Sequence, residues 1–365
     1  MACFLDIEGT GASTCPIGIH RDEKSDEDVD DADINDIIFS NVPIENVREG
    51  NNCYLYSHPE TLIDKKEIGK MLRGRTMQKL VCAIAVDEVH MISEWGKEFR
   101  KSFSRLGQLT SIFPNIPHLA LTATSTTADL KLLSKTLDFR ETHYIIANPD
   151  HPNIFMEIRR RLPNIKKFEK YDALLGEISQ EFEDKLQEFP VTIVYCDNLE
   201  SVGYSYAYMH HTLGERAYCD KDNQTPENRM FSQYHKDYTS KMKSHVISEL
   251  SKPNPRIRLI FATVALGMGL NVPAVNRIIH FRPPTTMEKY LQEIGRAGRS
   301  GQPATAIMFF NNNDITSNRK GLDPKMREFA LNTSTCLRIQ MLLYFGFKES
   351  LFNGQKELCC GNCRS

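Results

Sequence analysis

Several features that would point to particular classes of protein are missing from this sequence of 365 residues. No uninterrupted apolar run reaches the roughly 18 residues that a membrane-spanning helix needs, and the N-terminus lacks the basic-then-apolar pattern of a secretory signal. No Gly-Lys-Ser or Gly-Lys-Thr occurs in the N-terminal region, so residues 8–14 lack the ending of a phosphate-binding loop and are interpreted as a flexible turn. We therefore expect an intracellular protein without membrane contact.

A strong net charge is also missing, because 45 basic residues stand against 47 acidic ones. The distribution is uneven: residues 21–36 hold nine acids and two bases, and the rest of the chain carries a net charge of about +5. The acidic segment has no aromatic residue, and we expect it to be disordered. The mildly basic remainder permits binding to a phosphate backbone but does not by itself indicate it.

The ten cysteines are scattered, apart from the last four. With no secretory signal, this distribution favours free thiols and one metal site over a disulfide framework. The spacing of the last cysteines suits tetrahedral Zn²⁺, and reduced, unliganded thiols are the alternative. The candidate ligands are Cys336, Cys359, Cys360 and Cys363.

Short runs rich in β-branched and aromatic residues alternate with polar stretches that suit helices. This alternation predicts an α/β fold with parallel sheets covered on both faces. Prolines and turn-forming residues at 148–153 mark a linker, so we expect a divergent acidic segment (1–50), two α/β domains (51–150 and 151–315) and a helical module (325–365). The expected strands are 53–56, 80–86, 118–122, 143–147, 191–196, 256–262, 276–281 and 305–310.

Two adjacent carboxylates, Asp87 and Glu88, follow the apolar run 80–86. Open α/β sheets bind ligands at the C-terminal edge of their strands. One carboxylate at that edge can help to hold Mg²⁺ on a nucleotide, and the next can activate water. A solvated turn is the alternative for an isolated pair.

A glycine-containing turn and an arginine-rich segment close the second domain. Gly267 and Gly269 allow the backbone to approach a ligand closely. If the chain from Gln292 is helical, Gln292, Arg296 and Arg299 share one helix face, from which arginines can reach a phosphate. A solvated basic face is the alternative.

Five segments that occur in order resemble motifs II to VI of superfamily 2 helicases, specifically the RecQ family. The resemblance covers about residues 51–363. It implies two RecA-like domains, the first one incomplete, with ATP bound between them, and coupling of ATP hydrolysis to 3′→5′ translocation on single-stranded DNA. The segments are Asp-Glu-Val-His (87–90), Ala-Leu-Thr-Ala-Thr (120–124), Ile-Val-Tyr-Cys (193–196), Ala-Thr-Val-Ala-Leu-Gly-Met-Gly-Leu-Asn (262–271) and Gln-Glu-Ile-Gly-Arg-Ala-Gly-Arg (292–299).

The resemblance assigns roles residue by residue. Asp87 matches the acid associated with Mg²⁺, Glu88 the base that activates water, and His90 a link from the nucleotide to the DNA side. Trp95, Phe99 and Arg100 resemble the loop that senses single-stranded DNA, although a core position is the alternative for Trp95. Arg299 matches the arginine finger, with Arg296 and Gln292 beside it. Thr122 and Thr124 match the motif that couples the domains.

The tail from Cys336 resembles the start of the RecQ zinc module, and Cys360 and Cys363 resemble its Cys-x-x-Cys. The family's fourth cysteine would follow Cys363, and Cys359 could substitute, although adjacent cysteines rarely fit one tetrahedron. The resemblance thus implies ATP, Mg²⁺ and Zn²⁺ as cofactors. It also implies single-stranded DNA and duplex junctions as partners, repair or recombination proteins as possible partners, and a nuclear location if the source is eukaryotic.

The sequence departs from the family in several ways. The phosphate loop and the adenine-recognising residues are absent, so we expect a fragment or an N-terminally divergent relative whose ATPase activity is weak or lost. Arg282 stands where the family commonly has an acidic or polar residue. A catalytically inactive nucleic-acid-binding or regulatory relative is therefore the alternative. An RNA-directed superfamily 2 enzyme is disfavoured by the aromatic-rich loop and the zinc module.

Overall fold

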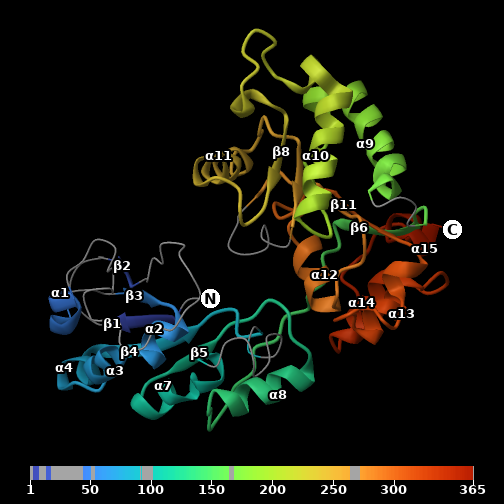
Figure 1. Cartoon of the computed structure of the whole chain (residues 1–365). Helices are drawn as coiled ribbons and strands as arrows, with labels where there is room; N and C mark the ends of the chain where they lie inside the picture. Colours follow the sequence, from blue (N-terminus) through green and yellow to red (C-terminus); the bar gives the residue numbers. More distant parts are fainter. Residues whose placement is uncertain are drawn as a thin grey trace. The chain divides into compact units, whose positions relative to one another are not determined.

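The chain divides into two compact units, Met1–Ala147 and Asn148–Ser365, which are described separately (Figure 1). The computed structural model describes residues 3–7, 14–17, 44–50, 54–90, 92, 102–163, 168–263 and 272–364. The acidic segment 21–36 lies outside the described residues. In the described part of the chain, no helix combines the length and the apolar character needed to span a bilayer.

Unit 1 is built on a five-stranded sheet with the order β2-β3-β1-β4-β5. The strands β2 and β3 are parallel, as are β4 and β5, whereas β1 runs antiparallel to both of its neighbours, β3 and β4. The strands are β1 (Cys3–Ile7), β2 (Thr14–Ile17), β3 (Tyr54–Ser57), β4 (Val81–Val86) and β5 (His118–Ala120).

This sheet corrects three predictions from the sequence. The sheet of unit 1 is mixed rather than parallel, and residues 1–50, expected to be disordered, contribute β1 and β2. These strands escaped notice because they are short and β2 contains Pro16, which is tolerated there because β2 is an edge strand. Residues 143–147 form no strand, and the Ile145 side chain is fully exposed.

The helices of unit 1 pack against β3 and β4 through apolar side chains. Val81, Ile84 and Val86 of β4 are buried together with Ile68 and Leu133. The start of α8 is fixed by a capping box, in which the Thr126 side chain accepts from the Asp129 amide and the Asp129 carboxylate accepts in return from the Thr126 amide. The helices are α1 (Ile44–Glu49), α2 (Pro59–Asp64), α3 (Lys66–Leu72), α4 (Arg75–Leu80), α7 (Gly107–Ile112) and α8 (Thr127–Thr136).

Unit 2 contains a six-stranded, wholly parallel sheet with the order β6-β11-β10-β7-β9-β8. Four of its strands confirm the runs expected from the sequence. The other two, β6 and β8, were missed because polar residues interrupt their apolar pattern. The strands are β6 (Ile154–Arg160), β7 (Thr192–Tyr195), β8 (Phe231–Tyr234), β9 (Leu259–Ala262), β10 (Arg277–His280) and β11 (Ala304–Phe310).

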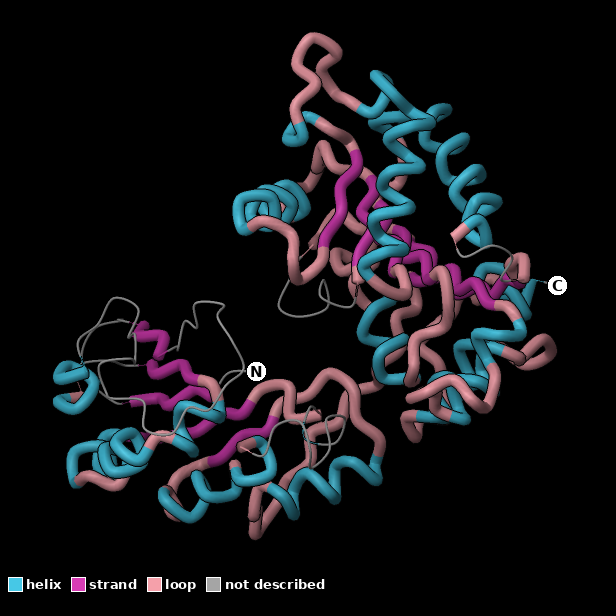
Figure 2. Tube along the Cα trace, viewed as in Figure 1, coloured by secondary structure: helices cyan, strands magenta, loops and turns pink. Residues whose placement is uncertain are grey.

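Helices cover both faces of this sheet, as the sequence predicted (Figure 2). Along β10, Ile278 packs into a core with α11, α12 and α14, whereas the next residue, Ile279, packs into a second core with α9 and α10. The helices are α9 (Asp172–Lys185), α10 (Leu199–Leu213), α11 (Ser240–Leu250), α12 (Met287–Ile294), α13 (Pro324–Ala330), α14 (Leu337–Tyr344) and α15 (Gly361–Arg364).

Candidate functional site

The adjacent carboxylates of unit 1 lie in a tight turn directly after β4. The Asp87 carboxylate accepts a hydrogen bond from the Glu88 amide at 2.8 Å. Glu88 adopts a left-handed backbone conformation with φ of 53°, which is unfavourable for a residue with a side chain. The turn is secured to the strand beside it, because Val89 donates to the Leu121 carbonyl and Leu121 donates to that of Val86. The fold therefore presents both carboxylates, each half-buried, at the C-terminal end of β4.

His90 joins this turn to the segment that follows β5. Its ring is buried, and Nδ1 lies 3.2 Å from Glu88 Oε2 and 3.1 Å from Thr122 Oγ1. The Thr122 hydroxyl donates to the Thr124 carbonyl at 3.2 Å and accepts from the Thr124 amide at 3.3 Å. Because the Thr122 proton is used in this way, the geometry favours a proton on Nδ1 that is donated to Thr122, whereas Glu88 Oε2, although 3.2 Å away, has no hydrogen-bond partner among the described residues. One imidazole thus connects a candidate base to a threonine 32 residues away in the sequence.

Five residues singled out from the sequence lie outside the described residues. They are Trp95, Phe99 and Arg100 of the aromatic-rich loop, together with Gly267 and Gly269 of the glycine-containing turn.

In unit 2 the arginine segment corrects the predicted helix. The helix α12 includes Gln292 but ends at Ile294, with Gly295 as its C-cap. The chain then turns twice, and Gly298 takes a positive φ of 68° while its amide donates to the Val275 carbonyl at 2.9 Å. Glycines permit these turns where other residues would be strained. Arg296 and Arg299 therefore lie in turns after the helix, and do not form one helix face with Gln292.

The two arginines are close but differ in exposure. Arg296 is buried, and its Nε and Nη1 have no hydrogen-bond partner among the described residues. Arg299 is exposed, and its Nε donates to the Gly295 carbonyl at 3.4 Å. The pKa of Arg299 is lowered, first by partial desolvation and then by the charge of Arg296. Two neighbouring guanidinium groups, one of which has no acceptor for two of its nitrogens among the described residues, suit an anionic ligand such as a phosphate.

A buried pair that the sequence analysis missed fixes α12 to the sheet. Nε2 of His280, at the end of β10, lies 2.8 Å from Glu293 Oε2, and both side chains are buried. The His280 ring also stacks on Tyr195, with the ring centres 5.2 Å apart. Burial raises the pKa of the Tyr195 hydroxyl. Glu293 lies within the Gln-Glu-x-Gly motif, but no spacing rule indicates that its partner is on a strand.

Arg282, which departs from the pattern of the resembled family, lies among acids at the C-terminal edge of the same sheet. Its Nη1 donates to Asp197 at 3.3 Å, and its Nε is 3.6 Å from Asp314. Asp314 also accepts two hydrogen bonds, at 2.7 and 2.8 Å, from the buried Arg161. Arg282 is therefore accommodated by acids of this unit.

The four cysteines of the tail converge, and all four sulfurs lie within 4.8 Å of one another. The distances from Cys336 Sγ to Cys359 Sγ and Cys360 Sγ are 3.6 and 3.9 Å. A tetrahedron of thiolates about 2.3 Å from Zn²⁺ has edges of roughly 3.8 Å, so the sulfur set fits this ion. The expectation that the adjacent Cys359 and Cys360 fit one tetrahedron poorly is corrected, because both sulfurs belong to the cluster.

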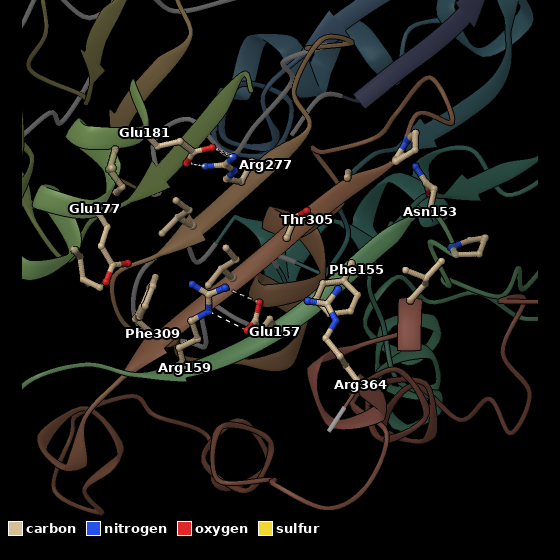
Figure 3. Close-up of a pocket in the computed structure, with 18 of the residues that line it drawn as sticks. Asn153, Phe155, Glu157, Arg159, Glu177, Glu181, Arg277, Thr305, Phe309 and Arg364 are labelled. Atoms are coloured by element: carbon tan, nitrogen blue, oxygen red, sulfur yellow. Dashed lines mark hydrogen bonds and ion pairs between the residues drawn. The ribbon is translucent and has the colours of Figure 1, made fainter. Parts of the chain in front are cut away.

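Each unit also has a cavity that the sequence did not reveal. In unit 2 a cavity of about 620 Å³ lies between α9, the β6–β11–β10 face and the tail, and none of the predicted site residues lines it (Figure 3). Ion pairs between Glu157 and Arg159 and between Glu181 and Arg277 border it. In unit 1 a cavity of about 730 Å³ lies beside β5 and α8, and Thr122 forms part of its wall.

Comparison with known proteins places these motifs in a family. The helicase conserved C-terminal domain matches residues 166–301. The ATP-dependent DNA helicase hus2/rqh1 of Schizosaccharomyces pombe is 30% identical over 324 residues, which are 84% of this chain and 22% of the relative. The ATP-dependent DNA helicase RecQ of Haemophilus influenzae is 28% identical over 78% of this chain and 42% of its own length. The chain thus spans less than half the length of these relatives.

Solved structures support the fold alone. The helicase MrfA bound to DNA has a TM-score of 0.61 at 14% identity, over 94% of this chain and 42% of that one. The Mycobacterium smegmatis helicase Lhr bound to single-stranded DNA and AMP-PNP has a TM-score of 0.57 at 18% identity, over 87% of this chain and 38% of that one. Together with the domain match, the parallel sheet of unit 2 gives this unit the RecA-like fold of the helicase conserved C-terminal domain. The chain is similar over most of its length to RecQ-type DNA helicases.

Proposed function

We propose that the chain acts as a RecQ-type, ATP-dependent DNA helicase, coupling ATP hydrolysis to 3′→5′ movement on single-stranded DNA and to duplex unwinding. The observation that carries this proposal is the position of His90 between Glu88 and Thr122. In the proposed mechanism Asp87 helps to hold Mg²⁺ on the nucleotide, and Glu88 orients or deprotonates the attacking water. A change in the protonation or position of Glu88 reaches Thr122 directly through the ring of His90.

Unit 2 supplies the positive charge in this proposal. Arg299, with Arg296 beside it, stabilises the charge that develops on the transferring phosphoryl group. The support is the pairing of an exposed guanidinium with a buried one whose Nε and Nη1 find no acceptor among the described residues. The DNA-sensing roles of Trp95, Phe99 and Arg100 remain predictions from the sequence, as do the nuclear location and the repair or recombination partners.

The catalytic competence of these 365 residues is a separate matter, because they contain no Gly-Lys-Ser or Gly-Lys-Thr. Without the loop lysine, the charge on the β- and γ-phosphates loses one of its stabilising partners. We therefore expect the chain by itself to hydrolyse ATP slowly or not at all. The second candidate function, favoured by this observation, is that of an inactive nucleic-acid-binding or regulatory relative.

An ATPase assay on the purified chain, with and without single-stranded DNA, separates the two functions. The variant Glu88→Gln removes the candidate base at nearly constant shape, and Glu67→Gln on the exposed surface of α3 is the matched control. DNA-stimulated turnover that is lost in Glu88→Gln and kept in Glu67→Gln establishes the enzyme and excludes the inactive relative. DNA binding without turnover in any variant supports the inactive relative. A chain that binds neither ATP nor DNA contradicts both candidate functions.

We further propose that the cysteine cluster binds one structural Zn²⁺ through Cys336, Cys359, Cys360 and Cys363. The convergence of four sulfurs supports the assignment, and the ion would tie the start of α14 to the end of the tail. Metal analysis of the purified chain tests it, with one zinc per chain expected. Cys359→Ser should reduce the zinc content strongly, whereas Cys219→Ser, a free cysteine elsewhere in unit 2, should not. A chain that contains no zinc rejects the site.

A further inference from the structure

The turns after α12, residues 295–302, contain both candidate phosphate-binding arginines and are called the arginine turn here. One side chain from the start of unit 2 makes several of the contacts that set its position. Asn153 Nδ2 donates to the Gly298 carbonyl and to the Gln302 carbonyl, both at 2.8 Å. The Asn153 carbonyl accepts from the Ala304 amide at 2.9 Å. Asn153 therefore contacts the arginine turn at Gly298 and Gln302, and it also contacts Ala304, which begins the strand after the turn.

The fit between Asn153 and the turn is close. A Cβ placed on Gly298 would lie 2.3 Å from Asn153 Nδ2, so only glycine allows this approach. A second contact comes from the neighbouring residue His151, whose Nε2 would lie 3.2 Å from a Cβ on Gly295. Residues 151–153 thus lie against the arginine turn at two of its three glycines, Gly295 and Gly298.

The same short segment is held from the other side by Arg338, a buried residue near the start of α14. One guanidinium nitrogen donates to the Asp150 carboxylate and, at 2.8 Å, to the His151 carbonyl. The other donates to the Ile154 carbonyl and, at 3.4 Å, to the carbonyl of Cys359 in the cysteine cluster. Arg338 also follows Cys336 by two residues. Both segments that carry the cysteines, the start of α14 and residues 359–363, therefore help to fix its position.

Further contacts from the tail complete this junction. The second oxygen of Asp150 accepts from the Ser350 hydroxyl and the Leu351 amide, both at 2.7 Å. Asn153 and Thr305 also border the cavity of unit 2, and both are labelled in Figure 3. The residues 150–153 therefore have the cysteine-bearing tail on one side and the arginine turn on the other.

We propose that Asn153 and Arg338 are positioning residues that link the order of the arginine turn to the integrity of the cysteine cluster. With the cluster closed, Arg338 holds residues 150–154, and Asn153 in turn holds the arginine turn. When the cluster opens, Arg338 loses its fixed position and the arginine turn gains freedom. The link would regulate the proposed phosphate-binding site. Only this regulatory role rests on the proposed function, because the contacts themselves do not depend on it.

Hydrogen–deuterium exchange on the full chain tests this link without ATP or DNA. The reporting amides are those of Gly298, Gly301 and Ala304, which donate within and beside the turn. In Asn153→Ala and in Arg338→Gln we expect these amides to exchange at least about tenfold faster. In Asn153→Ala the amides of β7 and β9 should be unchanged, and in Arg338→Gln they should accelerate less than the amides of the turn, which distinguishes a positioning role from a general loss of stability. Arg229→Gln, a buried arginine that donates to the Tyr218 hydroxyl, is the control and should leave the turn unaffected.

A second arm removes zinc from the metal-loaded chain with 1,10-phenanthroline and should reproduce the faster exchange at the turn. Unchanged exchange in Asn153→Ala, or in the folded Arg338→Gln variant and the zinc-depleted chain, overturns the proposal. If Arg338→Gln does not fold, the Asn153→Ala and phenanthroline arms decide. If the chain binds no zinc, the proposed dependence of the turn on the metal is rejected. The two variants then test whether Asn153 and Arg338 position the arginine turn. Loss of the helicase function alone would leave these exchange rates as expected.

Discussion

The two units hold their candidate site residues in different ways. In unit 2, three ion pairs near the functional segments are buried on both sides: Arg338–Asp150, Arg161–Asp314 and His280–Glu293 have side-chain exposures of 7% or less. Among the described residues of unit 1, the ion pairs are His90–Glu88, exposed by 6% and 27%, and Arg105–Asp64, exposed by 48% and 42%. The candidate phosphate-binding arginines therefore rest on a buried polar framework, whereas the carboxylates rest on a turn held mainly by backbone hydrogen bonds.

This difference separates two requirements of a motor. A group that stabilises developing charge must be held in place before the reaction, and a buried framework does this. A group that reports the state of the nucleotide must be able to move, and a strained, half-exposed turn at the end of a strand allows that. The comparison predicts that perturbations of unit 2 act through stability and that perturbations of unit 1 act mainly through chemistry.

The largest expected effect is the loss of metal from the cysteine cluster. Structural zinc contributes on the order of 10 kcal/mol to folding of small zinc domains, and we expect on the order of 5 kcal/mol or more for unit 2. Addition of a strong chelator should lower the unfolding temperature of unit 2 and leave that of unit 1 unchanged. Limited proteolysis followed by mass spectrometry assigns each transition to a unit. Equal destabilisation of both units would contradict the comparison.

The next effect comes from the buried pair Arg338–Asp150. Removal of one partner leaves a buried charge without compensation, so Arg338→Met should destabilise unit 2 by about 3–5 kcal/mol. The matched change in unit 1, Arg105→Met, removes an exposed partner of Asp64 and should cost at most about 1 kcal/mol. Urea unfolding of both variants measures the two values. Similar losses of unfolding free energy in the two variants would show that the buried ion pair of unit 2 contributes no more to stability than the exposed pair of unit 1.

The sequence predicted much of this framework but not its polar contacts. The strands β4, β7, β9, β10 and β11 were predictable because apolar, β-branched runs mark buried parallel strands. The carboxylate turn and the converging cysteines followed from motifs with definite spacing. The partners of buried charges did not follow, because His280 and Glu293 are 13 residues apart and Arg338 and Asp150 are 188 apart. Only the tertiary fold brings such residues together.

Two errors have local physical causes. The arginine segment looks like a continuation of α12, yet the helix ends at Ile294 and Gly298 reverses the chain with a positive φ, because glycine tolerates a conformation that periodicity rules ignore. The antiparallel insertion of β1 between β3 and β4 depends on pairing between distant segments, and a strand of five residues gives little signal of its partner.

A smaller, pH-dependent effect is expected at the ion pair of Glu181 with Arg277. The Arg277 guanidinium, with Lys185 as a second partner, lowers the pKa of Glu181 to about 2. A carboxylate whose pKa is depressed in the folded state stabilises the fold above its unfolded pKa of about 4.3, and this contribution disappears as the pH falls toward 2. Because the Glu181 side chain is 29% exposed, solvent screening reduces the expected gain to about 1–2 kcal/mol.

The measurement is urea unfolding of Glu181→Gln between pH 7 and pH 2. The variant should be less stable at pH 7, and the difference from the parent chain should shrink as the pH falls from about 5 toward 2. Glu67→Gln, which removes an exposed glutamate of unit 1, is the control for the loss of one surface carboxylate. A constant difference across this range would assign the effect of Glu181 to packing.

The smallest expected effect concerns the backbone of the carboxylate turn. Glu88 has a φ of 53°, a conformation that costs a residue with a Cβ roughly 1 kcal/mol relative to glycine. The variants Glu88→Gly and Glu88→Ala both remove the carboxylate and its contact with His90, so their difference isolates the backbone. We expect Glu88→Gly to be more stable than Glu88→Ala by about 1 kcal/mol in the unfolding of unit 1. In that case the turn retains a strained glutamate where glycine would be more stable, as expected when the side chain is needed for chemistry. If the alanine variant is equally stable, the turn relaxes freely, and the contrast with the rigid arginine turn of unit 2 becomes stronger.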